Sequence, residues 1–283
     1  MKPTLVFDVH AEHGEGALWD WRRGLLVSVD LNVGRLLLSD PRDGTTRAID
    51  VGRALGAAAL RGEHELVLAV RDGFMSIDLG TEEIAPLVPV EADEPGKRMN
   101  DAACDPRGRL FAGTMTDDGS QPVGVLYRLD ADLSVHPILE GLRISNGIGW
   151  SPPGDAMYHI DSMARGVDAY DYDRETGTPS NRRRPAGRDP EWGLPDGLAV
   201  DAEGGIWVAF WDGAAVRRFD PAGALTAVVD LPAARATRPA FGGENLDRLY
   251  VTTAMLDDES DAGGAIFVVE PGVRGVPAPI FAG

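Results

Sequence analysis

The sequence predicts an all-β protein that folds as a single six-bladed β-propeller with four antiparallel strands per blade. Three observations support this prediction. The 283 residues include 35 glycines and 20 prolines, which is high for a helical protein, and no long stretch has helical periodicity. Short apolar runs alternate with turn signals along the chain. A turn followed by a buried strand recurs six times, with copies that start at residues 24, 64, 108, 155, 204 and 247.

Each repeat unit contains enough β-structure for one blade. The turn-and-strand copies lie at residues 24–30, 64–69, 108–113, 155–161, 204–209 and 247–252. A more amphipathic segment follows each copy, at residues 34–40, 73–78, 124–130, 166–173, 214–220 and 264–270. A further β-rich piece comes after several of these, and one strand precedes each turn. Four strands per unit of about 40 to 50 residues are typical of a propeller blade. Two stacked β-sandwiches are the alternative, but they would not require six-fold spacing.

The repeat runs through the chain without a linker-like or low-complexity stretch, so we expect residues 1–283 to form one domain. A propeller has to close its ring, because open edge strands pair with other chains. We therefore expect residues 4–9 to pair with the last blade near residues 277–282. A closed ring leaves no edge that requires a partner, which favours a monomer.

Composition excludes several classes of partner. The chain has 27 basic and 45 acidic residues, and a net charge of −18 repels the phosphate backbone of a nucleic acid. No apolar run reaches the length of about 18 residues that a membrane span needs. The N-terminus lacks the apolar core of a signal peptide, so we expect a cytoplasmic protein. Cys104 is the sole cysteine, so an internal disulfide is ruled out. We expect Cys104 to behave as a small buried apolar residue.

Residues eight or nine positions before each turn should begin the innermost strand of a blade and face the central channel. These positions hold Glu15, Leu55, Asn100, Asn146, Asp196 and Arg238. Four of the six side chains carry oxygen, and most are followed by Gly or Ala, which lets the backbone approach a central group. Carboxylate and amide oxygens suit a hard divalent cation such as Ca²⁺, Mg²⁺ or Mn²⁺, with Zn²⁺ or Fe²⁺ less usual. A polar channel filled with water is the alternative.

Asp196 is the most informative of these residues. It stands at the mouth of a buried hairpin formed by residues 193–209. A carboxylate in such a place is costly unless something pairs with its charge. The partner could be a metal ion, an arginine or a ring of backbone N–H groups.

Several short motifs extend this pattern along the chain. They include Arg-Met-Asn-Asp at 98–101, Phe-Ala-Gly-Thr-Met at 111–115, Ile-Ser-Asn-Gly at 144–147, Pro-Asp-Gly at 195–197 and Phe-Gly-Gly-Glu-Asn at 241–245. With these motifs the chain resembles the senescence marker protein, regucalcin and gluconolactonase family of six-bladed propellers. The resemblance covers nearly the whole length.

The resemblance implies one divalent metal held by Glu15, Asn146 and Asp196, with waters or substrate completing the shell. It also implies that Arg98, Asn100 and Asp118 line a sugar pocket. The family usually has Glu at the position of Asp118, so this side chain is one methylene shorter. The family commonly has Gly where this chain has Ala102, a change that narrows the space there.

The activity that the resemblance implies is the opening of sugar lactones, such as gluconolactone or xylonolactone, to aldonic acids. A metal would polarise the lactone and activate a water molecule, with Asp196 as the general base. Two alternatives stay open: a non-catalytic calcium-binding propeller, and a metal-dependent esterase or phosphotriesterase on the same scaffold. The sequence has no Gly-x-Ser-x-Gly motif, which argues against a covalent serine mechanism.

For four aromatic residues that are close in sequence to the predicted ligands, the sequence leaves two possible roles open. His10 and His13 are close to Glu15 in sequence and are expected at the surface of the closing strand, with a place in the metal shell as the alternative. Trp192 and Trp211 are close to Asp196 and would either wall the pocket or pack between blades.

Overall fold

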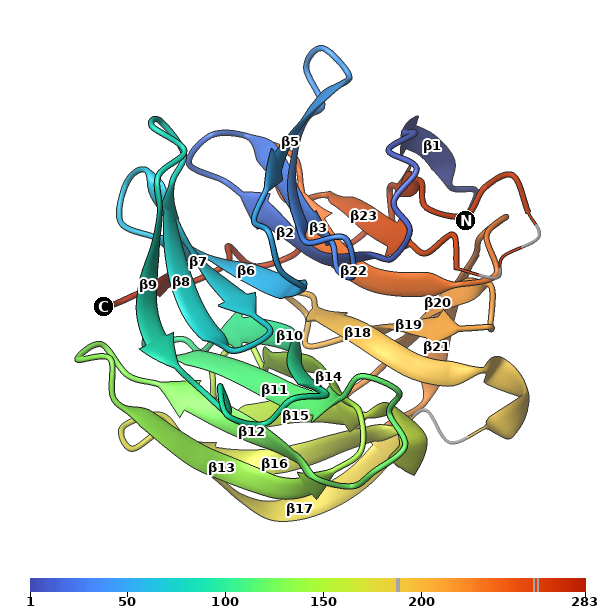
Figure 1. Ribbon diagram of the computed structural model, residues 1–283. Helices are drawn as coiled ribbons and strands as arrows, with labels where there is room; N and C mark the ends of the chain where they lie inside the picture. Colours follow the sequence, from blue (N-terminus) through green and yellow to red (C-terminus); the bar gives the residue numbers. More distant parts are fainter. Residues whose placement is uncertain (187–188, 257, 259) are drawn as a thin grey trace.

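The computed structural model describes residues 1–186, 189–256, 258 and 260–283. Six β-sheets surround one axis as the blades of a propeller, and the colours of Figure 1 follow the chain from blade to blade around the molecule. The predicted fold class is confirmed. In the described part of the chain the helical elements are two single 3₁₀ turns, η1 (Ser162–Ala164) and η2 (Pro190–Trp192). No helix among the described residues has the length and apolar character needed to cross a membrane.

In five blades the four strands follow one another in sequence from the axis outward, and in the sixth the N-terminal strand takes the outermost place. The first blade contains β2 (Gly14–Asp20), β3 (Leu25–Asp30), β4 (Arg35–Asp40) and β5 (Thr45–Asp50). The second contains β6 (Leu55–Arg61), β7 (Glu65–Val70), β8 (Gly73–Asp78) and β9 (Ile84–Pro89). The third contains β10 (Lys97–Cys104), β11 (Leu110–Thr116), β12 (Gly124–Leu129) and β13 (Val135–Leu142).

The remaining three blades continue the pattern around the ring. The fourth blade contains β14 (Ser145–Trp150), β15 (Ala156–Asp161), β16 (Val167–Asp173) and β17 (Thr178–Ala186). The fifth contains β18 (Leu194–Val200), β19 (Ile206–Trp211), β20 (Ala215–Phe219) and β21 (Leu225–Asp230). The sixth contains β22 (Ala236–Gly242), β23 (Arg248–Thr253), β24 (Ile266–Val269) and β1 (Thr4–Phe7).

Burial decreases from the axis to the rim of each blade. The second strands, such as β7 and β19, are buried on both faces, because each blade is covered by a neighbour on either side. The outermost strands, such as β13, have exposed residues along most of their length. In the described residues the core consists of six hydrophobic clusters, one between each pair of adjacent blades. Leu36 and Leu66, for example, pack between the first and second blades.

The ring closes in a different way from the prediction. β1 pairs in antiparallel fashion with β24, so strands from both ends of the chain complete the sixth blade. The predicted pairing of residues 4–9 with the last blade is confirmed, but the predicted partner residues 277–282 are wrong. β25 (Ile280–Phe281) instead pairs in parallel with β6 of the second blade. The physical reason is that β24 needs an outermost partner, whereas the segment after it continues past the first blade, where Trp21 Nε1 donates to the Ala278 carbonyl oxygen at 3.0 Å.

All six innermost strands contain a register shift against the second strand of their blade. The shifts lie between Glu15 and Leu18, Leu55 and Ala57, Met99 and Ala102, Ser145 and Ile148, Pro195 and Leu198, and Ala236 and Pro239. A bulge of this kind redirects side chains, and here it occurs at the positions that the repeat predicted to face the axis. The innermost strands also approach closely: a Cβ on Gly147 would lie 2.7 Å from the Asp196 carbonyl oxygen. Only glycine fits at that point.

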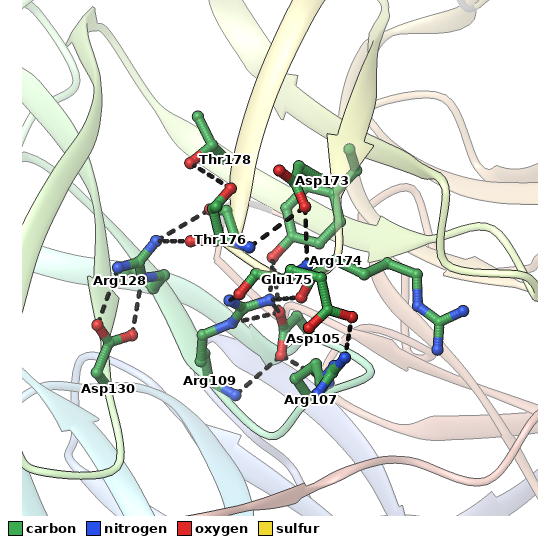
Figure 2. Close-up of polar contacts among 12 residues, drawn as sticks. Asp105, Arg107, Arg109, Arg128, Asp130, Asp173, Arg174, Glu175, Thr176 and Thr178 are labelled. Carbon is green, nitrogen blue, oxygen red and sulfur yellow. Dashed lines mark hydrogen bonds and ion pairs between the residues drawn. The ribbon is translucent and has the colours of Figure 1, made fainter.

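Buried aspartates stabilise the turns at the other end of the innermost strands. Asp20, Asp105 and Asp201 each have no exposed surface and each accept a hydrogen bond from an arginine Nε. Figure 2 shows the second of these, where Arg109 joins Asp105 of the third blade to the turn after β16 of the fourth. These carboxylates are structural, because their charge is already paired.

Candidate metal centre

Glu15, Asn146 and Asp196 come from the first, fourth and fifth blades and converge near the axis. Each is buried, with 4 to 6 % of its surface exposed. Asn146 Nδ2 donates to Asp196 Oδ1 and lies 3.2 Å from Ser162 Oγ. Glu15 is the charged group that acts most strongly on Asp196. The bulges of three separate innermost strands therefore bring together the residues that the sequence singled out.

Glu15 and Asp196 have too little positive charge around them to offset the cost of burying their ionised carboxylates. Burial raises the pKa of Glu15 to about 8, and the negative charge of Asp101 adds to this effect. Burial also raises the pKa of Asp196 well above its usual range, with Glu15 as the next cause. Glu15 Oε2 accepts a hydrogen bond from the Gly16 backbone N–H at 3.1 Å, which only partly opposes the shift. Buried carboxylates in this situation are stabilised by a cation.

Asn146 supplies a further observation that points to a cation. Its Oδ1 atom is buried and has no hydrogen-bond partner among the described residues. A buried amide oxygen without a partner is costly, and here the same amide group donates to the Asp196 carboxylate. In the described chain no three His, Cys, Asp or Glu side chains are grouped as metal ligands, so a metal centre here would need this amide as its third ligand. Two carboxylates and an amide oxygen fit a hard divalent cation.

Arg98 and Asn100 lie beside this set on β10. Arg98 Nη1 donates to Asn100 Oδ1 at 2.6 Å and to the Met99 carbonyl oxygen at 3.2 Å. Asn100 Nδ2 donates to the Ser145 carbonyl oxygen at 2.9 Å, which ties it to the strand that carries Asn146. Burial lowers the pKa of Arg98 to about 10. Both side chains are buried and held in place, and their role in binding a sugar stays a prediction.

Asp118 lies apart from these contacts. Its side chain accepts hydrogen bonds from Thr116 Oγ1 at 2.9 Å and from the Ser120 backbone N–H at 3.0 Å. The hydrogen bonds of its own turn, with Ser120 first, lower its pKa. It is exposed and caps a loop, so a place in the sugar pocket stays a prediction. Ala102, where the family commonly has Gly, is buried and its N–H donates to Asp101 Oδ1 at 2.7 Å.

His13 is placed differently from the expectation of a surface position. Its ring packs on Trp211 with the centroids 5.2 Å apart, and its Nδ1 is buried without a partner among the residues described. Burial, with smaller effects from Arg98 and Arg235, lowers its pKa to about 3. His10 is exposed, as expected. Trp192 packs against Phe210 and Phe219 in the cluster between the fourth and fifth blades, which was one of its two predicted roles.

Asp101 and Arg238 are also buried close to these residues, and the sequence pattern had assigned a function to neither of them. Asp101 Oδ1 accepts a hydrogen bond from Arg238 Nη1, so Asp101 pairs with the sixth blade and not with Arg98. Arg238 stood at one of the six predicted channel positions. A buried arginine there requires an acidic partner, and this requirement is the signal that could have identified the pair.

Comparisons with known proteins identify the family and support the fold. Residues 13–255 match the family described as the SMP-30/gluconolactonase/LRE-like region. Regucalcin of Xenopus laevis is 35 % identical over an alignment that covers 95 % of each chain. A Bacillus subtilis protein named "Putative sugar lactone lactonase YvrE" is 36 % identical over 255 residues, covering 90 % of this chain and 87 % of its own. The crystal structure of a calcium-binding protein, regucalcin from Agrobacterium tumefaciens, superposes with a TM-score of 0.95 at 27 % identity and covers 99 % of this chain and 98 % of its own.

Proposed function

Because the chain belongs to the SMP-30/gluconolactonase/LRE-like family, we propose that it is a metal-dependent hydrolase that opens sugar lactones, such as gluconolactone or xylonolactone, to aldonic acids. The observation that carries the proposal is the buried set of Glu15, Asn146 and Asp196, with Asn146 Oδ1 left without a partner among the described residues. The relative named as a sugar lactone lactonase supports the reaction class.

Glu15, Asn146 and Asp196 would hold one divalent ion through their side-chain oxygens. Their chemistry admits Ca²⁺, Mg²⁺ or Mn²⁺ most readily, with Zn²⁺ or Fe²⁺ as further possibilities. When bound, such an ion polarises the lactone carbonyl and lowers the pKa of a water molecule. The three side chains come from different blades, so the rigid ring fixes their separation before a substrate arrives.

Asp196 would act as the general base. It takes a proton from the attacking water as the water oxygen bonds to the lactone carbonyl carbon. The bond between that carbon and the ring oxygen then breaks, and the proton returns to the ring oxygen, which becomes the free hydroxyl of the aldonic acid. Burial and the charge of Glu15 favour the protonated form of Asp196, and this offsets the loss of basicity caused by a nearby cation.

Arg98 and Asn100 would orient the sugar. Arg98 has a guanidinium fork that can hold ring hydroxyls or the product carboxylate. Asn100 is anchored to the Ser145 carbonyl oxygen at 2.9 Å, so its position is fixed relative to the ligand on the next blade. Asp118 would reach the substrate from the loop after β11, where it is exposed.

The test is a hydrolysis assay with gluconolactone, xylonolactone and related lactones, before and after treatment with a chelator. We expect chelation to reduce the rate to that of spontaneous opening and added divalent ions to restore it. The variant Asp196→Asn should lose roughly 100-fold or more of the rate. Asp171→Asn, which changes an exposed carboxylate paired with Arg183, is the matched control and should retain the rate. Wild-type rates equal to spontaneous opening, with or without metal, would contradict the proposal.

A non-catalytic calcium-binding propeller is the second candidate, favoured by the calcium-binding regucalcin with a similar fold. On this view the ion only neutralises the buried carboxylates. Calcium would raise the melting temperature of the wild-type protein, Asp196→Asn would remove that increase, and no lactone would be hydrolysed faster than in buffer.

A further inference from the structure

Asp101 and Arg238 meet across the central channel. The innermost strands follow one another around the ring in the order β2, β6, β10, β14, β18 and β22, so β10 and β22 lie on opposite sides of the axis. Arg238 Nη1 on β22 donates to Asp101 Oδ1 on β10. The side chains are 10 % and 3 % exposed. An ion pair therefore spans the channel from the sixth blade to the third.

The surrounding structure holds Arg238 in this position. Its backbone N–H donates to Thr252 Oγ1 at 3.2 Å, and its carbonyl oxygen is 3.2 Å from the same hydroxyl. The side chain passes over Gly197, where an added Cβ would lie 2.4 Å from Arg238 Cδ. The glycine that follows Asp196 thus leaves the space that the arginine needs to cross the axis.

Asp101 lies at the edge of the metal-ligand set. It is the charged group that acts most strongly on Glu15, and it also acts on Asp196. Its Oδ1 is used by Arg238 and by the Ala102 N–H, whereas its Oδ2 is buried without a hydrogen-bond partner in the described part of the chain. A third carboxylate next to a two-carboxylate centre would normally be a further ligand for a divalent ion.

An apolar cavity lies next to Arg238. A cavity of about 760 Å³ is lined mainly by small apolar residues of the innermost strands, among them Ala17, Ala58, Ala199 and Ala240, and Arg238 borders it. Asp101 has no other basic partner that an observed hydrogen bond or ion pair identifies among the described residues.

We propose that Arg238 is a built-in cation that holds Asp101 out of the metal shell and limits the protein ligands to Glu15, Asn146 and Asp196. Three protein ligands leave coordination positions for water and substrate. This inference rests on the proposed metal centre, but it concerns the number of ligands and not the reaction. Arg238 is accordingly a positioning residue that acts through Asp101.

The test is isothermal titration calorimetry of Ca²⁺ into chelator-treated protein. Arg238→Gln frees Asp101 and removes one positive charge, so we expect Ca²⁺ to bind roughly 10- to 100-fold more tightly than in the wild type. The double variant Arg238→Gln/Asp101→Asn replaces the ion pair with two neutral side chains, and its affinity should return to within about three-fold of the wild type. Arg238→Lys keeps the charge and should also stay near the wild-type affinity.

Melting temperatures measured with chelator and with saturating Ca²⁺ provide a second readout. Arg238→Gln leaves Asp101 buried and unpaired, so it should melt lower than the wild type in chelator and gain more from Ca²⁺. This comparison also applies if the variant folds only when Ca²⁺ is present.

The outcomes separate the two proposals. Equal affinity in the wild type and Arg238→Gln would overturn the role of Arg238 and leave the metal centre standing. Equally tight binding by Arg238→Gln and the double variant would overturn it as well, because the gain would then not require the Asp101 carboxylate. A double variant that binds at least 10-fold more weakly than the wild type would mean that Asp101 is already a ligand. Absence of Ca²⁺ binding in every variant would overturn the role of Arg238, whereas the lactonase proposal would still be decided by the hydrolysis assay with the other divalent ions.

Discussion

The pKa values of buried titratable side chains in this protein shift in different directions, depending on the charged groups near each side chain. Burial alone would raise the pKa of Asp20, but the hydrogen bonds and charge of Arg22 outweigh it and the pKa is lowered. Asp196 is buried as well, but Asn146 and the more distant Arg238 oppose burial too weakly, and its pKa rises. A carboxylate with an arginine partner is a structural element, whereas one without such a partner is available to bind a cation.

His159 illustrates the same principle for a base. It is buried on β15, and its Nε2 is 2.9 Å from Ser145 Oγ. Burial lowers its pKa to about 4, and the charges of Asp161 and Asp168 oppose this only in part. The folded state therefore contains neutral His159 under conditions where the unfolded chain binds a proton.

This depression predicts a pH dependence of stability. The contribution of neutral His159 is fully present above pH 6.5 and is lost as the pH falls toward about 4, because the unfolded state then binds the additional proton. Within that pH range, His159 should lower the free energy of unfolding by up to about 1.4 kcal/mol for each unit by which the pH falls. Urea denaturation of the wild type and His159→Gln at several pH values, both in chelator, would measure it. The variant should have the shallower slope; parallel slopes would show that His159 does not contribute.

At the scale of an element, buried carboxylates fasten the turns that join the first and second strands of a blade. Asp105 accepts hydrogen bonds from Arg109 Nε at 2.7 Å and Tyr172 Oη at 2.6 Å. Arg109 in turn donates to the Arg174 and Glu175 carbonyl oxygens, as Figure 2 shows. One carboxylate thus connects the third blade to the turn after β16 of the fourth.

We expect Asp105→Asn to lower the free energy of unfolding by about 3 to 5 kcal/mol, because it leaves Arg109 without its buried counter-charge. Arg107→Gln is the control from the same turn. Its ion pair with Glu175 is exposed, and its loss should cost less than about 1 kcal/mol. Denaturant titrations of the two variants would decide; similar losses in both would contradict the structural role of Asp105.

At the scale of the whole molecule, stability depends on closing the ring with strands from both ends of the chain. Thr4 pairs with Val268, and Phe7 pairs with Ile266. Phe7 is 2 % exposed and packs with Trp19, Leu26 and Tyr250 between the sixth and first blades. The closing strand therefore adds a core residue as well as backbone hydrogen bonds.

This arrangement predicts that Phe7→Ala destabilises the protein by about 3 to 5 kcal/mol. Leu5→Ala lies on the same strand, but its side chain is 46 % exposed, and its loss should cost below about 1 kcal/mol. Urea unfolding of both variants and the wild type, monitored by tryptophan fluorescence, would measure the two values. A small effect of Phe7→Ala would mean that β1 closes the ring through its backbone alone.

The sequence by itself determined the repeat and what each repeat is made of. Turn residues and apolar runs are local signals, so the second strands and the channel positions from Glu15 to Arg238 could be located by counting along the chain. The oxygen-bearing side chains at four of these positions were enough to predict a metal centre.

The tertiary structure decided which residues from different blades meet. Asp101 and Arg238 are 137 residues apart in sequence, and β1 finds β24 from the opposite end of the chain. His13 also makes a contact with a residue far away in the sequence, because its ring packs on Trp211 of the fifth blade. Local periodicity says nothing about such contacts, because they exist only once the ring is closed and six separate bulges face one axis.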